Sequence, residues 1–584
     1  MSYDYGSQTL GIRNPFRFEG SLIATRGALV ALGGFYGLFQ VAGLVNRGRD
    51  LEGWICAGLG LLLVIWGLTA LGQGLLKVFR FYVGRSVPAS LAPNQADSGN
   101  RDHNAYRSEE LRDMLMARKN TTFKEPQSLF SRLIHSLLPR LLFMPPVYRA
   151  LAENLLFSLS ISLFMLLAFG LVWFANATGL AHLDNTPVMA WLGLLLTLYL
   201  LKLWLGMRDP FRHFSRGAMD ISLLRIGLTL ALAILLPVAL AYAHRHVQAI
   251  PRLPINTLPH LLTLLLLGAI TTGLGLYLLA QRLKLAEPST EVSEHRNNWQ
   301  KNLMPRELFI HLESHILANR RHQEIPNRIY QKFEPTLCQE GGSEKGTFGG
   351  RTLVETQPIL SEIAYGNGFR TVRVVTSVLG QALLAIGALS LIGLSADLAR
   401  VAQQPALLSG LIMPGLLLIF GRVLSRMGNA FWAEMQFRSL LLELSVEGTY
   451  TESKLSTGTG IYDSTRSENT VVRSTITPWF LVSDLLTSTF AITGNMNLEQ
   501  ERCILSLDKA DEALDAVLGE LEEFFASRQT IAGINEVDLQ SASQIYQMNE
   551  QTRAIPAQPA TLAVPAEQAA GLIARAEEQQ GTAT

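Results

Sequence analysis

The sequence predicts a mainly α-helical, polytopic membrane protein, with about eight transmembrane helices in four hairpins and small mixed α/β segments on the cytoplasmic side. Three observations predict this class. Long apolar runs recur along the chain, the segments between them alternate between basic and charge-poor, and the mean hydropathy of the 584 residues is only +0.22. A chain this polar on average cannot lie in lipid throughout, so sizeable soluble segments must accompany the spans.

The predicted spans are runs that come near the ~20 apolar residues needed to cross a ~30 Å hydrocarbon core. They cover 28–45, 54–76, 155–174, 188–205, 221–243, 261–279, 374–396 and 406–423. The central part of each run lacks Asp, Glu, Lys and Arg. Ionisable groups inside spans usually mark a transport pathway, so no proton relay or ion site is predicted. The first run is too long for a cleaved signal, and we interpret it as a retained span.

These runs divide the chain into eight segments. In order, they are a cytoplasmic N-terminus (1–20), a first hairpin (21–78), a linker with an interfacial amphipathic helix (79–150), a four-helix transmembrane block (151–282), a cytoplasmic insertion (283–370), a fourth hairpin (371–426), a cytoplasmic C-terminal region (427–535) and a disordered tail (536–584).

Loop charge predicts the orientation. The segments after the second, fourth, sixth and eighth runs hold most of the Lys and Arg residues near the spans, whereas 176–186 holds none. Because basic flanks stay on the cytoplasmic side, both termini and every large soluble segment are expected there, in a multi-pass protein of a bacterial-type inner membrane. The three cysteines are scattered and predict no disulfide framework.

Two stretches predict helix packing and membrane contact. Gly33 and Gly37 stand four residues apart and predict a close helix-packing face, although glycine is common in membrane helices anyway. In 129–143 apolar pairs recur every four residues between basic ones, and Pro139 is expected to bend the segment. This pattern predicts a helix in the membrane interface or, alternatively, a core helix of a small cytoplasmic domain.

The soluble segments carry weaker signals. Short helices are expected at 108–118 and 306–321, and a helix through 431–447 is expected to prolong the last span. Extended structure is expected at 352–356 and 470–477.

The C-terminal stretch 498–527 predicts a long helix with an apolar seam and an acidic remainder. The seam follows steps of three and four residues, as in a coiled coil or a helix docked in a groove. Its members predicted to bind a partner are Leu507, Leu514, Val517, Leu521 and Phe524. Packing of the same stripe on the chain's own cytoplasmic region explains the pattern equally well.

Two motifs were considered for chemistry. His311 and His315 lie one helical turn apart, but the stretch departs from zinc-protease spacing, so no metal site is predicted. In 341–347, Lys345 precedes the last glycine instead of following it, which does not fit a phosphate-binding loop. Neither a catalytic residue nor a cofactor is predicted.

The favoured function is therefore a non-catalytic inner-membrane scaffold that assembles a cytoplasmic or envelope complex, such as a secretion or conjugation apparatus. Its expected partners are other membrane or cytoplasmic proteins and the lipid bilayer, with self-association as a further option. The net charge of +1 gives no reason to expect direct nucleic-acid binding. The alternative is a transporter or channel that moves an uncharged or weakly polar substrate through the helices. A membrane enzyme that uses His311 and His315 is the weakest hypothesis.

Overall fold

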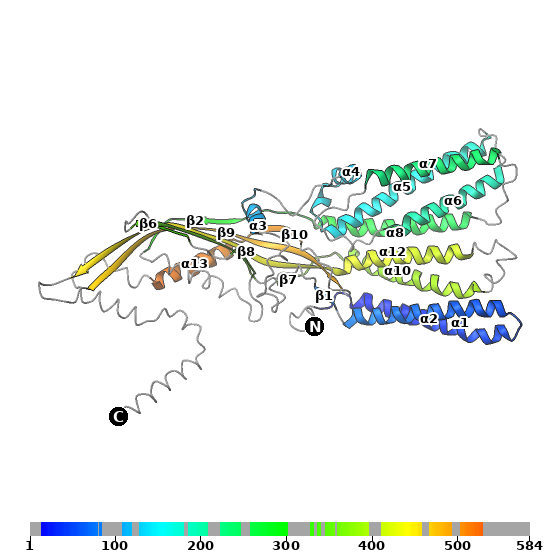
Figure 1. Ribbon diagram of the computed structural model, residues 1–584, viewed down its shortest axis with the longest axis horizontal. Coiled ribbons are helices and arrows are strands. Elements are labelled where there is room, and N and C mark those ends of the chain that lie inside the picture. The colour runs from blue at the N-terminus through cyan, green and yellow to red at the C-terminus, as the bar shows by residue number, and fades with distance from the viewer. Residues whose placement is uncertain are drawn as a thin grey trace, which may run out of the picture.

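The fold combines a helical bundle with one long antiparallel sheet (Figure 1). The structure, a computed structural model, describes residues 13–79, 81–83, 108–118, 126, 128–179, 185–207, 222–246, 257–301, 328–331, 336–339, 345–356, 359–395, 410–457, 467–492 and 503–528. Residues 84–107 of the predicted linker, the tail (536–584) and the expected helix 306–321 with His311 and His315 lie outside these residues.

Each of the eight predicted runs overlaps a helix of the bundle within the described residues. The helices are α1 (Arg17–Val45), α2 (Asp50–Phe79), α5 (Pro146–Ala177), α6 (Asn185–Leu205), α7 (Leu223–His246), α8 (Leu258–Lys284), α10 (Asn367–Gly393) and α12 (Ile412–Ala433). Five of them, α1, α2, α5, α8 and α10, are long and apolar enough to cross a membrane. These five helices indicate a membrane-embedded protein.

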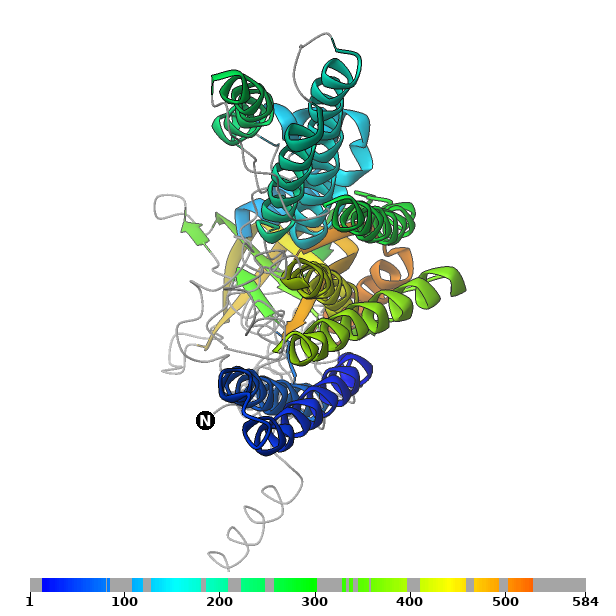
Figure 2. The same cartoon turned by 90° about the vertical axis from the view of Figure 1, so that its right-hand side faces the viewer.

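The bundle is a row of contacting helices rather than a closed ring. Viewed along the helices, α1 and α2 form a pair at one edge, and α5, α6 and α7 lie at the other (Figure 2). The pair contacts α10, which packs on α12, and α12 in turn contacts α8. Many large apolar side chains of the bundle point outward, as lipid-facing helices require, and Phe39 is 85% exposed.

Glycines bring α1 and α2 into close contact. Gly27 of α1 faces Gly67 of α2, and a Cβ atom on Gly27 would stand 2.4 Å from the backbone nitrogen of Leu71. The same approach repeats one heptad away on either side, at Gly20 with Gly74 and at Gly34 with Gly60. Backbones that approach this closely tolerate only glycine, as in small-residue packing of membrane helices.

The sheet is built around a long hairpin, β8 (Glu434–Thr457) and β9 (Ser467–Ile492). The path through the sheet is β1-β9-β8-β6-β4, and the shorter strands pair with one of the two hairpin strands or, beyond β8, with β6. These shorter strands are β1 (Tyr82–Val83), β2 (Ser293–Arg296), β3 (Trp299–Lys301), β4 (Arg328–Gln331), β5 (Thr336–Gln339), β6 (Lys345–Glu355), β7 (Ile359–Ser361) and β10 (Cys503–Lys509). Figure 1 shows the sheet extending away from one end of the bundle.

The expected helix through 431–447 is wrong beyond Ala433, because α12 ends there and β8 begins at Glu434. The strand is covered on both faces. Leu441 packs towards α3 (Ser108–Leu115), while Leu442 and Leu444 pack towards α13 (Asp511–Arg528). A strand buried on both sides has a continuous apolar run, which periodicity does not distinguish from a helix. The extended structure expected at 352–356 and 470–477 falls in or beside β6 and β9.

The expected helix over 498–527 is wrong at its start, because Cys503–Lys509 forms β10 and α13 begins only at Asp511. The apolar steps cross from strand to helix at Ala510 and therefore do not belong to one helical face. Both elements pack into the protein's own interior, β10 against β9 and α13 against one face of the sheet.

The segment 129–143 forms two short helices. α4 (Leu129–Leu137) begins with the side chain of Ser128 accepting a hydrogen bond from the backbone N–H of Ser131. A 3-10 helix, η4 (Pro139–Phe143), follows directly. The break before Pro139 has the expected cause, since proline disfavours helical conformation in the preceding residue.

Candidate functional site: the buried junction of bundle and sheet

The bundle and the sheet are connected by four short chain segments at one end of the helices. β1 follows α2, β2 follows α8, β7 precedes α10, and β8 continues α12 without an intervening residue. The strands that enter the sheet here, β1, β2 and β7, all pair with β9 or β8. The junction therefore joins the bundle to the sheet at four places, and the side chains at its centre can couple the two parts of the molecule.

Arg282 and Glu434 form a buried ion pair at this junction, which we call the junction pair. Their side chains are 1% and 0% exposed. The Arg282 Nη2 atom donates to Glu434 Oε1 at 2.7 Å, and Nε donates to Oε2 at 3.0 Å. This two-pronged geometry is the strong form of a guanidinium–carboxylate contact. The pair joins the last turn of α8 to the first residue of β8.

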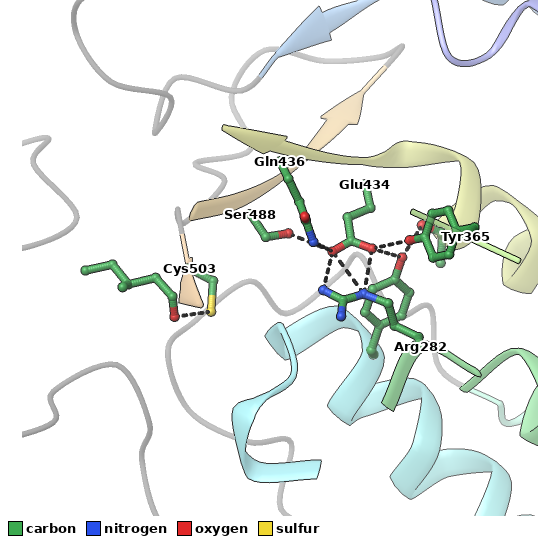
Figure 3. A network of polar contacts seen from close by, with 9 residues as sticks. Arg282, Tyr365, Glu434, Gln436, Ser488 and Cys503 are labelled. Atoms are coloured by element: carbon green, nitrogen blue, oxygen red, sulfur yellow. Dashed lines mark hydrogen bonds and ion pairs between the residues drawn. The ribbon is translucent and has the colours of Figure 1, made fainter. Parts of the chain in front are cut away.

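Four further side chains donate to the Glu434 carboxylate. The hydroxyls of Tyr148 and Tyr365 each lie 2.8 Å from Oε2. The Ser488 hydroxyl lies 3.1 Å and the Gln436 amide 3.4 Å from Oε1. Figure 3 shows Arg282 and Tyr365 approaching the carboxylate from different sides, with Gln436 and Ser488 on the strands beside it. The carboxylate thus holds α5, α8, the segment before α10, and both long strands together.

This environment keeps Glu434 ionised. Burial alone would raise the pKa of Glu434, but the Arg282 guanidinium and the hydrogen bonds from Arg282, Tyr365 and Tyr148 outweigh burial and hold the pKa below its usual value. The Tyr365 hydroxyl shows the opposite effect, because burial and the nearby carboxylate raise its pKa well above the usual value. A carboxylate with this many donors is suited to structural coupling, and its low pKa makes it a poor general base.

Aromatic rings enclose the junction pair. The ring of Tyr148 stacks on Phe431 with a centroid distance of 5.0 Å, and Tyr365 stacks on Phe369 at 3.9 Å. Water is largely excluded by such packing, which strengthens the electrostatic attraction inside. A cavity of about 160 Å³ lies beside the pair and is lined in part by Arg282 and Gln436.

A second buried charged group lies where α4 packs on α5. Arg149 and Glu153, in the first turns of α5, are each 1% exposed. His135 of α4 reaches towards them, with its Nδ1 atom 4.0 Å from Glu153 Oε1 and 2.7 Å from the backbone oxygen of Ser131. Charge is therefore concentrated at the sheet end of the bundle.

A larger cavity, of about 520 Å³, lies at the other end of the helices. It is bordered by the end of α5, by α6 and by the start of α8, and its lining is mainly apolar. Trp173 and Met189 are among its lining residues. It contains none of the charged residues of the junction.

The residues predicted to bind a partner are buried. Leu507, in β10, is 1% exposed, and the α13 residues Leu514, Val517, Leu521 and Phe524 are 9%, 0%, 1% and 3% exposed. Leu507 packs in a cluster with α3, and the other four pack beneath the sheet. These side chains are covered by the chain's own sheet and by α3. The stripe matches the alternative prediction, in which it packs on the chain's own cytoplasmic region.

The two predicted packing glycines lie on α1 and face α10. A Cβ atom on Gly33 would stand 2.1 Å from Leu389 Cδ2, and one on Gly37 would stand 3.6 Å from Ile392 Cγ2. Gly37 also approaches α2, since its Cβ atom would stand 3.8 Å from Cys56 Sγ and from Gly60 Cα. Within the described part of the chain, no group of three or more His, Cys, Asp or Glu residues could hold a metal ion.

The junction pair is the feature that sequence reasoning missed. Arg282 and Glu434 are 152 residues apart in the chain, so no local spacing connects them. The available signal was weak, since Arg282 belongs to the basic flank after the run 261–279 and Glu434 lies within the apolar-rich stretch 431–447. The expected helix through 431–447 would place Glu434 inside a helix, whereas it is the first residue of β8.

Comparison with known proteins adds no family to these observations, because no family model, curated protein or solved structure matches the chain.

Proposed function

We propose that this chain is a non-catalytic, polytopic inner-membrane scaffold that holds its sheet rigidly in the cytoplasm for assembly of a protein complex. In this proposal all eight long helices cross the membrane as four hairpins, and both termini lie in the cytoplasm with the sheet. The observation that carries the proposal is the junction, where one buried carboxylate ties three segments of the bundle to both strands of the hairpin.

The charge distribution supports this orientation. The end of the bundle that joins the sheet carries the basic segments that follow α2 and α8. Basic flanks mark the cytoplasmic side, so the sheet and the helices that cover it project into the cytoplasm. The shorter apolar stretches of α6 and α7 and the Arg422-containing α12 complete the four hairpins.

Rigid attachment suits a scaffold better than a moving gate. A two-state element needs two arrangements of similar free energy, but breaking the junction pair would leave a buried, unpaired charge. The exposed surface of α13 offers the acidic side chains Asp511, Glu512, Asp515, Glu522 and Glu523 to solvent. A partner with a basic surface would be attracted there, which replaces the buried apolar stripe as the proposed contact.

The test is quantitative purification of tagged protein from its native membrane after mild cross-linking. A scaffold is expected to bring along a specific companion in fixed ratio, and reversing charge with Glu522→Lys and Glu523→Lys should reduce that companion at least tenfold. Glu109→Lys is the matched control, because Glu109 is an exposed acid on α3, which covers the other face of the sheet. Equal recovery from all variants would refute a contact at α13.

A second measurement addresses the scaffold itself. Purified protein in liposomes is expected to give no flux of small uncharged solutes above that of empty liposomes. A saturable flux, together with no companion in the native membrane, would overturn the scaffold proposal in favour of a transporter.

A further inference from the structure

We propose that α4 is a membrane-surface anchor, which inserts its exposed leucines among the headgroups of an anionic phospholipid bilayer beside the bundle. The proposal concerns the lipid and stands or falls separately from the scaffold function, since it requires only that the bundle is embedded in a membrane.

The exposed side of α4 is apolar, which is unusual for a helix on a water-soluble surface. Leu129, Leu133 and Leu137 are 63%, 53% and 72% exposed, and their spacing of four residues puts them on one side of the helix. The buried side is mixed in polarity, because Ser131 and His135 are covered there together with Ile134. In water the leucines would be expected on the covered side, so their exposure indicates an apolar environment.

The depth of α4 along the bundle agrees with a position at the membrane surface. The ring of Phe130 packs edge-on against Phe157 of α5, with a centroid distance of 5.7 Å. Arg225, near the start of α7, covers the same Phe157 ring at 5.1 Å. Phe157 stands close to the start of the apolar run of α5, and Arg225 is suited to reach the headgroups. Figure 1 places α4 beside the sheet end of α5 and α7.

The charges near the leucines select the kind of lipid. Arg132 and Arg140 are exposed on α4 and η4, and neither helix contains an acidic residue. Arg132 also donates from Nε to the backbone oxygen of Pro126 at 3.1 Å, which orients its guanidinium. Basic side chains beside exposed leucines are the composition of helices that lie in an anionic lipid surface. A protein partner would not require this combination.

The experiment is depth measurement by electron paramagnetic resonance on the full chain in liposomes. Cys338, which is exposed, is replaced by serine, whereas Cys56 and Cys503 are buried and are left in place. A nitroxide is attached to Leu133→Cys and, as a control in the sheet, to Glu447→Cys, which replaces an exposed residue of β8. In vesicles containing phosphatidylglycerol, the Leu133 label is expected about 5–10 Å inside the headgroup boundary, with high oxygen and low nickel-chelate accessibility. The Glu447 label is expected to remain accessible to the chelate.

Two further arms decide the outcome. Arg132→Glu with Arg140→Glu should raise chelate accessibility at the Leu133 label severalfold in phosphatidylglycerol vesicles and change it little in pure phosphatidylcholine. Equal chelate accessibility of both labels in every vesicle would overturn the proposal. A Leu133 label shielded from oxygen and chelate alike would also overturn it, since that result indicates contact with protein. Unchanged protection of Cys503 from maleimide establishes that each variant is folded.

Discussion

Removing the Glu434 carboxylate should release the sheet from the bundle. In Glu434→Leu the Arg282 guanidinium, 1% exposed, remains buried without its partner. Loss of one member of a buried pair costs about 3–5 kcal/mol, mainly because the remaining charge is uncompensated. Since each 1.4 kcal/mol is tenfold in an equilibrium constant, the population in which the junction is open should rise by about 10²- to 4 × 10³-fold.

Two buried cysteines make the opening measurable. Cys503 of β10 is 6% exposed and reports on the sheet, whereas Cys56 of α2 is 2% exposed and reports on the first hairpin. We call them the sheet thiol and the hairpin thiol. In a Cys338→Ser background, maleimide labelling in detergent should accelerate by that factor at the sheet thiol and remain unchanged at the hairpin thiol. Labelling follows the open population when opening and closing are fast relative to the reaction.

The control and the double variant make the prediction refutable. Glu447→Leu changes an exposed glutamate of the same strand and should leave both thiols as in the wild type. Arg282→Met combined with Glu434→Leu should recover most of the loss, because no buried charge remains, apart from the cost of two unpaired tyrosine hydroxyls. If Glu434→Leu labels like the wild type, the junction pair does not couple bundle and sheet. The same conclusion follows if the cost of the double variant equals the sum of the costs of Glu434→Leu and Arg282→Met measured separately.

Four other outcomes are expected. The pKa of Glu434 is lowered on folding, so the ionised side chain stabilises the fold above the usual pKa of 4.5, and this stabilisation is lost as the pH falls through the lowered pKa. Melting curves at successive pH values would detect the loss. Burial raises the pKa of Glu443 despite nearby arginines, so the ionised side chain destabilises the fold and stability increases as the pH falls through the raised pKa. Glu443→Gln should remove this pH dependence of stability. Gly27→Ala should separate α1 from α2 and expose the hairpin thiol, whereas Gly72→Ala, with nothing within 4 Å, should not. Val517→Asp buries a charge at a 0% exposed position beneath the sheet and should abolish protection of the sheet thiol, whereas any refolded, protected protein would contradict the packing of α13.

The bundle was predictable because its signals are local. A run such as 155–174 is long, apolar and free of charge, and only a helix satisfies its backbone groups in lipid. The glycine contacts between α1 and α2 were also within reach. Gly20, Gly27 and Gly34 repeat every seven residues, as do Gly60, Gly67 and Gly74. The spacing of four between Gly33 and Gly37 instead predicts a contact that the structure places mainly against α10.

The sheet was not predictable by the same means. The run from Leu440 to Leu442 is apolar because α3 and α13 cover opposite faces of β8, and neither helix is close to it in sequence. The seam through Leu507 and Leu514 crosses a boundary between strand and helix that spacing alone does not reveal. In both places, tertiary contacts decide the local structure.

The position of the junction pair explains why a charged contact is useful where an apolar one could be more stable. β8 and β9 pair in register from Glu434 with Phe490 to Thr457 with Ser467, a length over which hydrogen bonding alone would also permit a shift by two residues. An apolar contact at the first position would tolerate such a shift, because it has no directional requirement. Glu434 does not tolerate it, since only one register places its carboxylate against Arg282 and Ser488 together. The junction pair therefore fixes a single alignment between the sheet and the membrane helices, although burying the two charges costs free energy. A single alignment is the property that a scaffold requires.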